Sequence, residues 1–295
     1  RTAKSLRYPN FEDRAPERHD RGIERERLLY SSQPCPSPTE PQPSSDGVPV
    51  TTPRIGREYY DAGDYFEGAG SGHVTDPDSP FQRYRVEKVL DLHRPRPRVR
   101  VRDMGCGWGT FSFALAPHVG EVVGVDFSER SIAFCERRLA REPQPNLRFV
   151  QADAGDTGLE PASWDVVVAA DPSEHLYPDD AQRVAREAFR LLRPGGRFVT
   201  WTPNPGHLIE MLKRRDILIR RDPTHVDYKS MRRMRELLVG AGFEIEEARY
   251  FESHLRGLRV AERMLQGLVP FLRRRIAVLG RRPRVASLAP SAGEG

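Results

Sequence analysis

The chain has 295 residues, of which 38% are hydrophobic and 30% are charged, so it can bury a large core and is too long for a peptide hormone or a minimal disulfide scaffold. Its mean hydropathy is −0.62 and no apolar run reaches membrane-spanning length, so we expect no membrane span. The three cysteines are too few and too scattered for a disulfide framework or a zinc site, which favours a reducing compartment and a cytoplasmic location.

The net charge of +5 is concentrated at the end of the chain. Residues 253–295 carry nine Arg and two Glu, so this segment is strongly basic and the preceding part of the chain is slightly acidic. A basic terminal segment is not a binding groove, and we therefore expect a small-molecule partner rather than nucleic acid. The oligomeric state is not indicated by any pattern in the sequence.

The first 98 residues divide into a tail and a lid region. Residues 1–55 are predicted to be disordered, because seven prolines lie between Pro34 and Pro53 among Ser, Thr and Gln. Residues 56–98 hold an aromatic cluster, Tyr59 to Phe66, followed by a predicted helix at Phe81–Leu92. The cluster is either ordinary core or a mobile lid that closes over a ligand; its position before the first strand suits a lid.

Short apolar runs alternate with amphipathic segments between residues 99 and 250. Strands are predicted at Val99–Asp103, Glu121–Asp126, Leu147–Ala152, Trp164–Ala170, Gly196–Thr202 and Phe243–Tyr250. Helices are predicted at Gly109–His118, Ser128–Arg141, Asp179–Leu192 and Tyr228–Gly240. This alternation indicates right-handed crossovers and predicts a doubly wound, mostly parallel α/β sheet of seven strands, with helices on both faces.

The predicted α/β domain covers residues 99–252, and residues 253–295 form a basic helical extension. A helix is predicted over Leu255–Leu279, broken near Pro270, and a short edge strand at Arg284–Leu288. We interpret the helix as packed on the sheet with its Arg side chains in solvent; a membrane-surface or partner-binding role is the alternative.

A glycine-rich turn follows the first predicted strand. The three glycines at 105, 107 and 109 allow a tight turn and a close approach of a ligand to the backbone. Asp103 ends the first strand and Asp126 ends the second, where a carboxylate can accept both hydroxyl protons of a ribose. The combination indicates a cofactor that contains a nucleoside.

The glycine spacing favours a cationic cofactor. A dinucleotide-binding turn has the pattern G-x-G-x-x-G, whereas here Gly109 comes one residue early. The carboxylate of Asp103 would repel a pyrophosphate and attract an ammonium or a sulfonium. The residues therefore favour S-adenosylmethionine over NAD.

The sequence resembles the class I S-adenosylmethionine-dependent methyltransferases from about Tyr59 to Tyr250. Four segments in chain order carry the resemblance, at residues 103–109, 123–128, 151–154 and 192–198. The resemblance implies that the cofactor contacts Asp103, Gly105, Gly107, Gly109, Asp126, Phe127, Asp153 and Ala154. Within that set it implies Asp126 on the ribose, Phe127 against the adenine ring and Asp153 near the adenine amino group.

The candidate acceptor site follows the fourth strand. His175 is a general base for a hydroxyl acceptor, or Glu174 and His175 tie the loop by hydrogen bonds. Alternatively Asp171, Glu174 and His175, with His225 as a fourth ligand, hold Mg²⁺ or Mn²⁺. That spacing resembles the E-x-x-E-H element of O-methyltransferases of ubiquinone biosynthesis and of those that methylate the 2′-hydroxyl of small RNA 3′ ends, with Asp171 in place of the first Glu.

We therefore expect a methyltransferase that acts on a hydroxyl of a small molecule by in-line transfer. One alternative is a metal-dependent RNA 2′-O-methyltransferase, with a basic path formed by Arg214, Arg215, Arg220 and Arg221. The other alternative is a non-enzymatic partner subunit that binds the cofactor.

Overall fold

The computed structural model describes residues 54–61, 76, 79–217, 222 and 224–284. Several expectations lie outside these residues: nearly all of the predicted tail, Tyr65 and Phe66 of the aromatic cluster, Arg220 and Arg221, and the predicted edge strand beyond Arg284.

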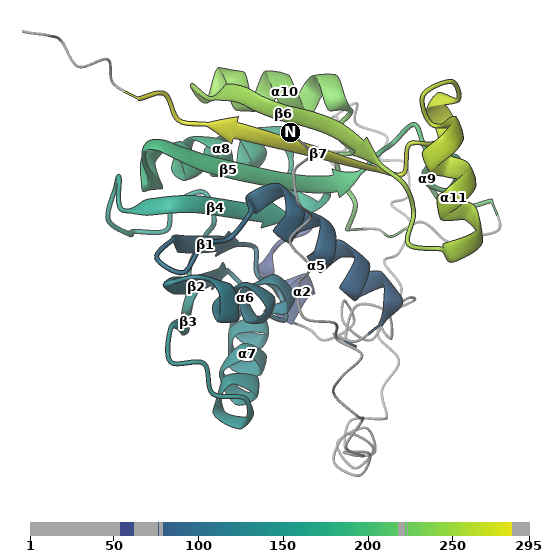
Figure 1. The fold of residues 1–295 in the computed structure, drawn as a ribbon. Helices are drawn as coiled ribbons and strands as arrows, with labels where there is room; N and C mark the ends of the chain where they lie inside the picture. Colours follow the sequence, from purple (N-terminus) through teal and green to yellow (C-terminus); the bar gives the residue numbers. More distant parts are fainter. Residues whose placement is uncertain (1–53, 62–75, 77–78, 218–221, 223, 285–295) are drawn as a thin grey trace, which may run out of the picture. The chain divides into compact units, whose positions relative to one another are not determined.

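Seven strands form one sheet in the order β3-β2-β1-β4-β5-β7-β6 (Figure 1). The strands are β1 (Arg100–Met104), β2 (Glu121–Asp126), β3 (Leu147–Gln151), β4 (Trp164–Ala170), β5 (Leu192–Pro203), β6 (Glu244–Phe251) and β7 (Arg275–Arg281). The pairs among β1 to β5 are parallel, and β7 is antiparallel to both β5 and β6. The predicted doubly wound, mostly parallel seven-stranded sheet is confirmed.

Helices cover both faces of the sheet. The α-helices are α2 (Arg57–Asp61), α5 (Pro80–His93), α6 (Thr110–Leu115), α7 (Glu129–Arg141), α8 (Pro178–Leu191), α9 (Leu208–Arg214), α10 (Met231–Gly240) and α11 (Arg256–Leu265). Short 3₁₀ helices are η2 (Ala116–His118), η3 (Ser173–His175) and η4 (Pro270–Leu272). Serine side chains cap α5, α7 and α10 by accepting a backbone N–H of the first turn, which fixes where these helices begin.

The core consists of two clusters, one on each face of the sheet. The first packs the sheet against α5 and α6, and the second packs it against α8 and α10. Along β4 the side chains alternate between them: Val166 and Val168 join the first cluster and Val167 joins the second. Both faces are buried, which explains the continuous apolar run from Val166 to Ala170 in β4.

The structure corrects the expected helix over Leu255–Leu279. The helix ends at Leu265, and Arg275–Arg281 is strand β7, inserted between β5 and β6. Residues 276–279 are buried on both faces of the sheet. The periodicity of such a short apolar run fits a helix as well as a strand. Here the run is a strand because β5 and β6 pair with it on either side.

Among the described residues, no helix has both the length and the apolar character that crossing a bilayer requires.

His93, at the end of α5, makes stability depend on pH. It is buried, neither ring nitrogen has a hydrogen-bond partner among the described residues, and burial lowers its pKa to about 4. In the unfolded chain the pKa is about 6.5. Between these values the unfolded state binds the extra proton, so the contribution of His93 is present above the unfolded pKa and is lost as the pH falls towards the folded pKa.

We therefore expect His93→Leu to reduce the loss of unfolding free energy between pH 7 and pH 5 by about 2 kcal/mol. Urea denaturation at both pH values measures the difference, and pH 8 provides the baseline for each protein. Equal pH dependence in the variant and the parent would contradict the buried neutral state of His93.

Candidate functional site

The candidate site lies at the carboxyl edge of the parallel strands. β1 has β2 on one side and β4 on the other, so the strand order reverses at β1. The glycine turn follows β1, and η3 follows β4. Open α/β sheets bind their ligands at such a reversal, beyond the ends of the strands.

The glycine turn curves back over the end of β2. The backbone N–H groups of Gly105 and Cys106 both donate to the Val125 carbonyl, at 2.8 and 3.0 Å. Gly105 has φ +69°, and a Cβ there would lie 2.8 Å from Cβ of Pro172. Gly107 has φ +51°, and no described atom lies within 4 Å of the place of its missing Cβ. The turn is thus closed towards the β4 loop and open beside Gly107.

Two carboxylates flank this turn. Asp103 is buried and accepts a hydrogen bond from Ser112 Oγ at 2.6 Å; burial raises its pKa to about 6. Asp126 accepts the N–H of Gly107 at 2.8 Å and that of Ser128 at 3.0 Å. Burial also raises the pKa of Asp126, and the two backbone donors oppose that rise. Asp126 therefore ties the end of β2 to the glycine turn.

Helix α2 lies across the ends of β2 and β4. The ring of Tyr60 lies 5.1 Å from the ring of Phe127 and 6.4 Å from that of His175, centroid to centroid. Asp61 accepts a hydrogen bond from Ser128 Oγ at 2.7 Å. The described part of the aromatic cluster thus touches both the predicted cofactor side and the predicted acceptor side.

Asp153 and Ala154 lie beyond β3. The carboxylate of Asp153 is half exposed; it forms an ion pair of 2.6 Å with Arg183 of α8 and accepts the N–H of Gly155. Ala154 packs against the core on the α8 face. Asp153 therefore contacts α8, through Arg183, and the turn in which it lies, through Gly155.

Glu174 is a buried carboxyl at the centre of η3. Its Oε2 accepts a hydrogen bond from Thr202 Oγ1 at 2.9 Å, and its backbone carbonyl accepts the N–H of Val226 at 2.9 Å. Burial raises its pKa well above the usual range, and the nearby charge of Asp171 adds to the rise. These hydrogen bonds join Glu174 to β5, through Thr202, and to the loop that carries His225, through Val226.

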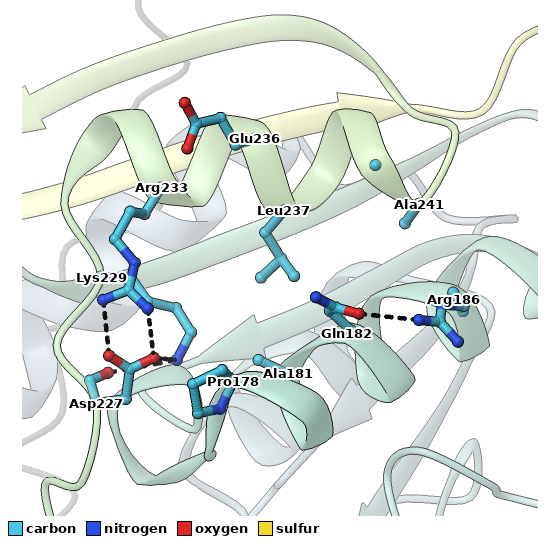
Figure 2. A pocket seen from close by; sticks show the side chains of 11 residues that line it. Pro178, Ala181, Gln182, Arg186, Asp227, Lys229, Arg233, Glu236, Leu237 and Ala241 are labelled. Atoms are coloured by element: carbon cyan, nitrogen blue, oxygen red, sulfur yellow. Dashed lines mark hydrogen bonds and ion pairs between the residues drawn. The ribbon is translucent and has the colours of Figure 1, made fainter.

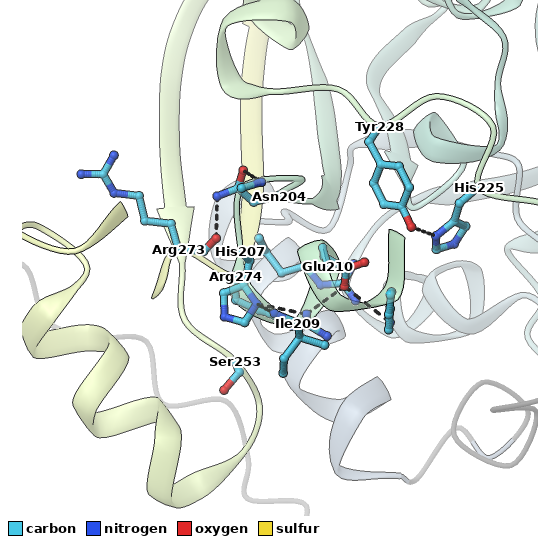
Figure 3. A network of polar contacts seen from close by, with 12 residues as sticks. Asn204, His207, Ile209, Glu210, His225, Tyr228, Ser253, Arg273 and Arg274 are labelled. Carbon is cyan, nitrogen blue, oxygen red and sulfur yellow. Dashed lines mark hydrogen bonds and ion pairs between the residues drawn. The ribbon is translucent and has the colours of Figure 1, made fainter. Parts of the chain in front are cut away.

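His175 faces a second histidine. Its ring lies 4.8 Å from the ring of His225, and burial lowers its pKa to about 4, with the charge of His225 as the next cause. His225 Nδ1 forms a hydrogen bond of 2.8 Å with Tyr228 OH (Figure 3), and burial lowers its pKa as well. One ligand atom each from Glu174, His175 and His225 lie within 4.8 Å of one another.

Asp171, the remaining expected metal ligand, is not in this cluster. Its two oxygens form ion pairs with Arg85 of α5 and with Arg275 of β7, the latter at 2.9 Å. Asp171 also has φ +65°, which turns the chain sharply as it leaves β4. The carboxylate lies near enough to Glu174 to raise its pKa, but it is paired with two guanidinium groups and is not among the three residues whose ligand atoms converge.

Lys229 also supports the candidate site, although it is not among the residues that the sequence motifs indicate. Its buried Nζ donates to the backbone carbonyls of Ser173, at 2.6 Å, and Leu176, at 3.1 Å, which lie on either side of Glu174 and His175. Figure 2 shows Lys229 and Arg233 directed at Asp227, beside a cavity of about 330 Å³ between α8 and α10. The sequence offers one indication of its importance: almost all of the 47 basic residues are Arg, so a Lys at this position is unusual in this chain.

The comparisons with known proteins agree with this geometry. Residues 101–196 match the family model described as "Methyltransferase domain". A "Probable S-adenosylmethionine-dependent methyltransferase" of Mycolicibacterium smegmatis is 38% identical over 126 residues, 43% of this chain and 44% of that protein. The "Demethylmenaquinone methyltransferase" of Lactococcus lactis is 36% identical over 80 residues, 27% of this chain and 31% of that protein.

A solved structure shares the fold. The Haemonchus contortus phosphoethanolamine N-methyltransferase 2 in complex with S-adenosyl-L-methionine aligns with a TM-score of 0.55 and 19% sequence identity, over 77% of this chain and 58% of that chain. The chain spans less than half the length of the two curated relatives that it matches. The matched segment runs from β1 into β5 and so contains the glycine turn, both flanking carboxylates and η3.

The ion pairs of Asp171 predict a structural role. Removing its charge leaves two buried guanidinium groups without their carboxylate, and breaking a buried pair in this way costs roughly 3–5 kcal/mol. We expect Asp171→Asn to lower the free energy of unfolding by about 3 kcal/mol, measured by urea denaturation. Asp179→Asn is the matched control, because its ion pair with Arg54 is exposed; equal stability of the two variants would contradict the assignment.

Proposed function

We propose that this chain, a class I S-adenosylmethionine-dependent methyltransferase, transfers the methyl group to a hydroxyl oxygen of a small molecule. The observation that supports this best is the arrangement at one edge of the sheet: the glycine turn and its two carboxylates end β1 and β2, and the buried Glu174 and half-buried His175 follow β4. Cofactor residues and candidate acceptor residues are therefore neighbours on adjacent strands.

The residues fit the cofactor in shape and charge. Open space beside Gly107 permits a close approach to the backbone, and the lack of a Cβ keeps it open. Asp126 lies at the mouth of the turn with two oxygens suited to ribose hydroxyls, and Phe127 offers a ring next to it. When bound, the cofactor supplies an electrophilic methyl on a positively charged sulfur, and the charge of Asp103 favours that cation.

His175 is the candidate base. Because its pKa is about 4, the imidazole is neutral at pH 7 and can accept the proton that the acceptor hydroxyl must lose. A base this weak deprotonates an acidic hydroxyl far better than an alkyl alcohol, and a phenol has a pKa of about 10. We therefore favour a phenolic or enolic acceptor over a sugar.

A second candidate assigns Glu174, His175 and His225 to a divalent metal, since their ligand atoms lie within 4.8 Å of one another. The lowered pKa values keep both imidazoles neutral, the form that coordinates a metal. Two imidazoles and one carboxylate suit Mn²⁺ better than Mg²⁺, which prefers oxygen donors. A metal there would lower the pKa of the acceptor hydroxyl and replace the base.

For the cofactor we expect Asp126→Asn to weaken the binding of S-adenosylhomocysteine by about 10- to 100-fold, because a charged acceptor of several hydrogen bonds is lost. Isothermal titration calorimetry measures the dissociation constant. The matched control is Glu129→Gln, which removes a nearby exposed carboxylate at the start of α7. Unchanged affinity in Asp126→Asn, or an equal loss in both variants, would reject the proposed role of Asp126.

For the acceptor we expect kcat/KM to stay high down to about pH 5 and to fall towards pH 4, as the imidazole of His175 becomes protonated. His175→Gln should lower kcat by at least about 10²-fold and remove this acidic limb. His118→Gln, on η2 at the far edge of the sheet, is the control. The profiles are measured with and without EDTA: activity that is lost in EDTA and restored by Mn²⁺ would assign His175 to the metal instead.

A further inference from the structure

Helix α11 packs on the protein with its polar side inward. Glu262 is completely buried, whereas Val260 and Met264 are 60% and 77% exposed. A surface helix of a globular domain normally buries its apolar stripe and exposes its charges. This helix does the reverse, so the packing of α11 does not explain its apolar residues.

A buried polar network holds α11 in this orientation. Glu262 contacts His207 Nε2 at 3.2 Å through Oε1, and its Oε2 accepts the backbone N–H of Ser253. His207 also caps α9, because its Nδ1 accepts the N–H of Ile209 at 3.2 Å. Arg274 donates to Glu210 of α9 at 2.8 Å. Figure 3 shows His207, Glu210 and Arg274 close together beside α9.

The outward side of this segment is an apolar surface, here called the α11 patch. Seven of the ten large apolar side chains that are exposed among the described residues belong to it: Leu255, Leu258, Val260, Met264, Leu265, Leu268 and Phe271. Its most exposed members, Val260, Met264 and Leu268, recur every four residues, and Leu268 is 84% exposed. A contiguous apolar surface of this kind indicates an interaction site.

The rim of the α11 patch is positive. The acid on α11, Glu262, points inward, while Arg259 and Arg263 share the carboxylate of Glu252, and Arg259 also lies 3.9 Å from Glu87 Oε1. Arg273 donates to the backbone carbonyls of Gln266 and Gly267, and within the described part of the chain no carboxylate pairs with it. Figure 3 shows Arg273 directed away from the buried network. The exposed segment therefore has an excess of positive charge.

We propose that the α11 patch docks the protein on the surface of an anionic lipid bilayer. Apolar side chains on one side of a short helix and arginines beside them match the acyl and the headgroup layers of such a surface. A second copy of the chain would cover the apolar residues but would bring the same arginines into contact with each other, which like charges oppose. The positive charge of the rim therefore favours an anionic bilayer over a second copy of the chain as the partner of the α11 patch.

The patch lies at the edge of the sheet that carries the candidate site. α11 connects β6 to β7, and the start of β7 pairs with the end of β5. In Figure 1, α9 and α11 lie together beyond the end of β5. Docking would therefore bring the acceptor side to the bilayer surface, and an acceptor dissolved in that surface is the substrate class that follows; this last step rests on the proposed function.

The test is co-sedimentation of the full chain with vesicles of phosphatidylglycerol and phosphatidylcholine, compared with phosphatidylcholine alone. We expect binding to the anionic vesicles only, at least tenfold weaker for the double variant Met264→Glu, Leu268→Glu, and weakened by high salt. Both substituted side chains are largely exposed, so the fold is retained. Val239→Glu is the matched control, because Val239 is 57% exposed on α10 and lies outside the patch.

Equal binding of the double variant and the control, or no binding to either vesicle, overturns the proposal. Equal binding to neutral and anionic vesicles also overturns it, because the arginine rim then plays no part. A concentration-dependent dimer that the double variant abolishes would replace the bilayer by a second copy. Titration of the same proteins with S-adenosylhomocysteine separates the proposed methyl transfer from the proposed docking. If the parent chain does not bind S-adenosylhomocysteine, the methyl transfer is rejected and the vesicle result still stands.

Discussion

Asp171 carries one negative charge at the point where the chain leaves β4, and two guanidinium groups share it. Arg85 comes from α5, before the first strand, and Arg275 comes from β7, near the end of the described chain. All three side chains are largely buried, so solvent does not replace the lost partner when one of them is changed. This ion cluster joins α5, the end of β4 and the inserted strand β7, and η3 begins two residues after Asp171.

The same burial shifts the pKa values of the site in opposite directions. Carboxyl groups at this edge, Asp103 and Glu174, have raised pKa values, and the imidazoles of His175 and His225 have lowered ones. Each shift favours the neutral form, because desolvation penalises charge. In this buried region of low dielectric constant, the positive charge of a bound ligand would be poorly screened. The carboxylate nearest to that charge would therefore be stabilised most strongly in its ionised form.

The parts of the fold that could be predicted from sequence are those with local signals. The end of β2 at Asp126 follows from an apolar run that stops at an acid, and the glycine turn follows from its residue types, although β1 ends one residue after Asp103. The ion cluster could not be predicted, because Asp171 and Arg275 are 104 residues apart. It requires β7, whose apolar residues at 276–279 fit a helix as well as a strand until β5 and β6 pair with them.

The insertion of β7 also fixes the chain around the acceptor side. Once β7 lies beside β5, the segment between β6 and β7 must project from the carboxyl edge, where α11 contacts the start of α9 through Glu262 and contacts α5 through Arg259. α9 leads in sequence to His225, which faces His175, while Lys229 holds the turn around Glu174. A change in the position of α11 would therefore act on α9 through the His207–Glu262 contact. The outer surface and the interior of the protein are thus coupled at the start of α9, where His207 also caps the helix.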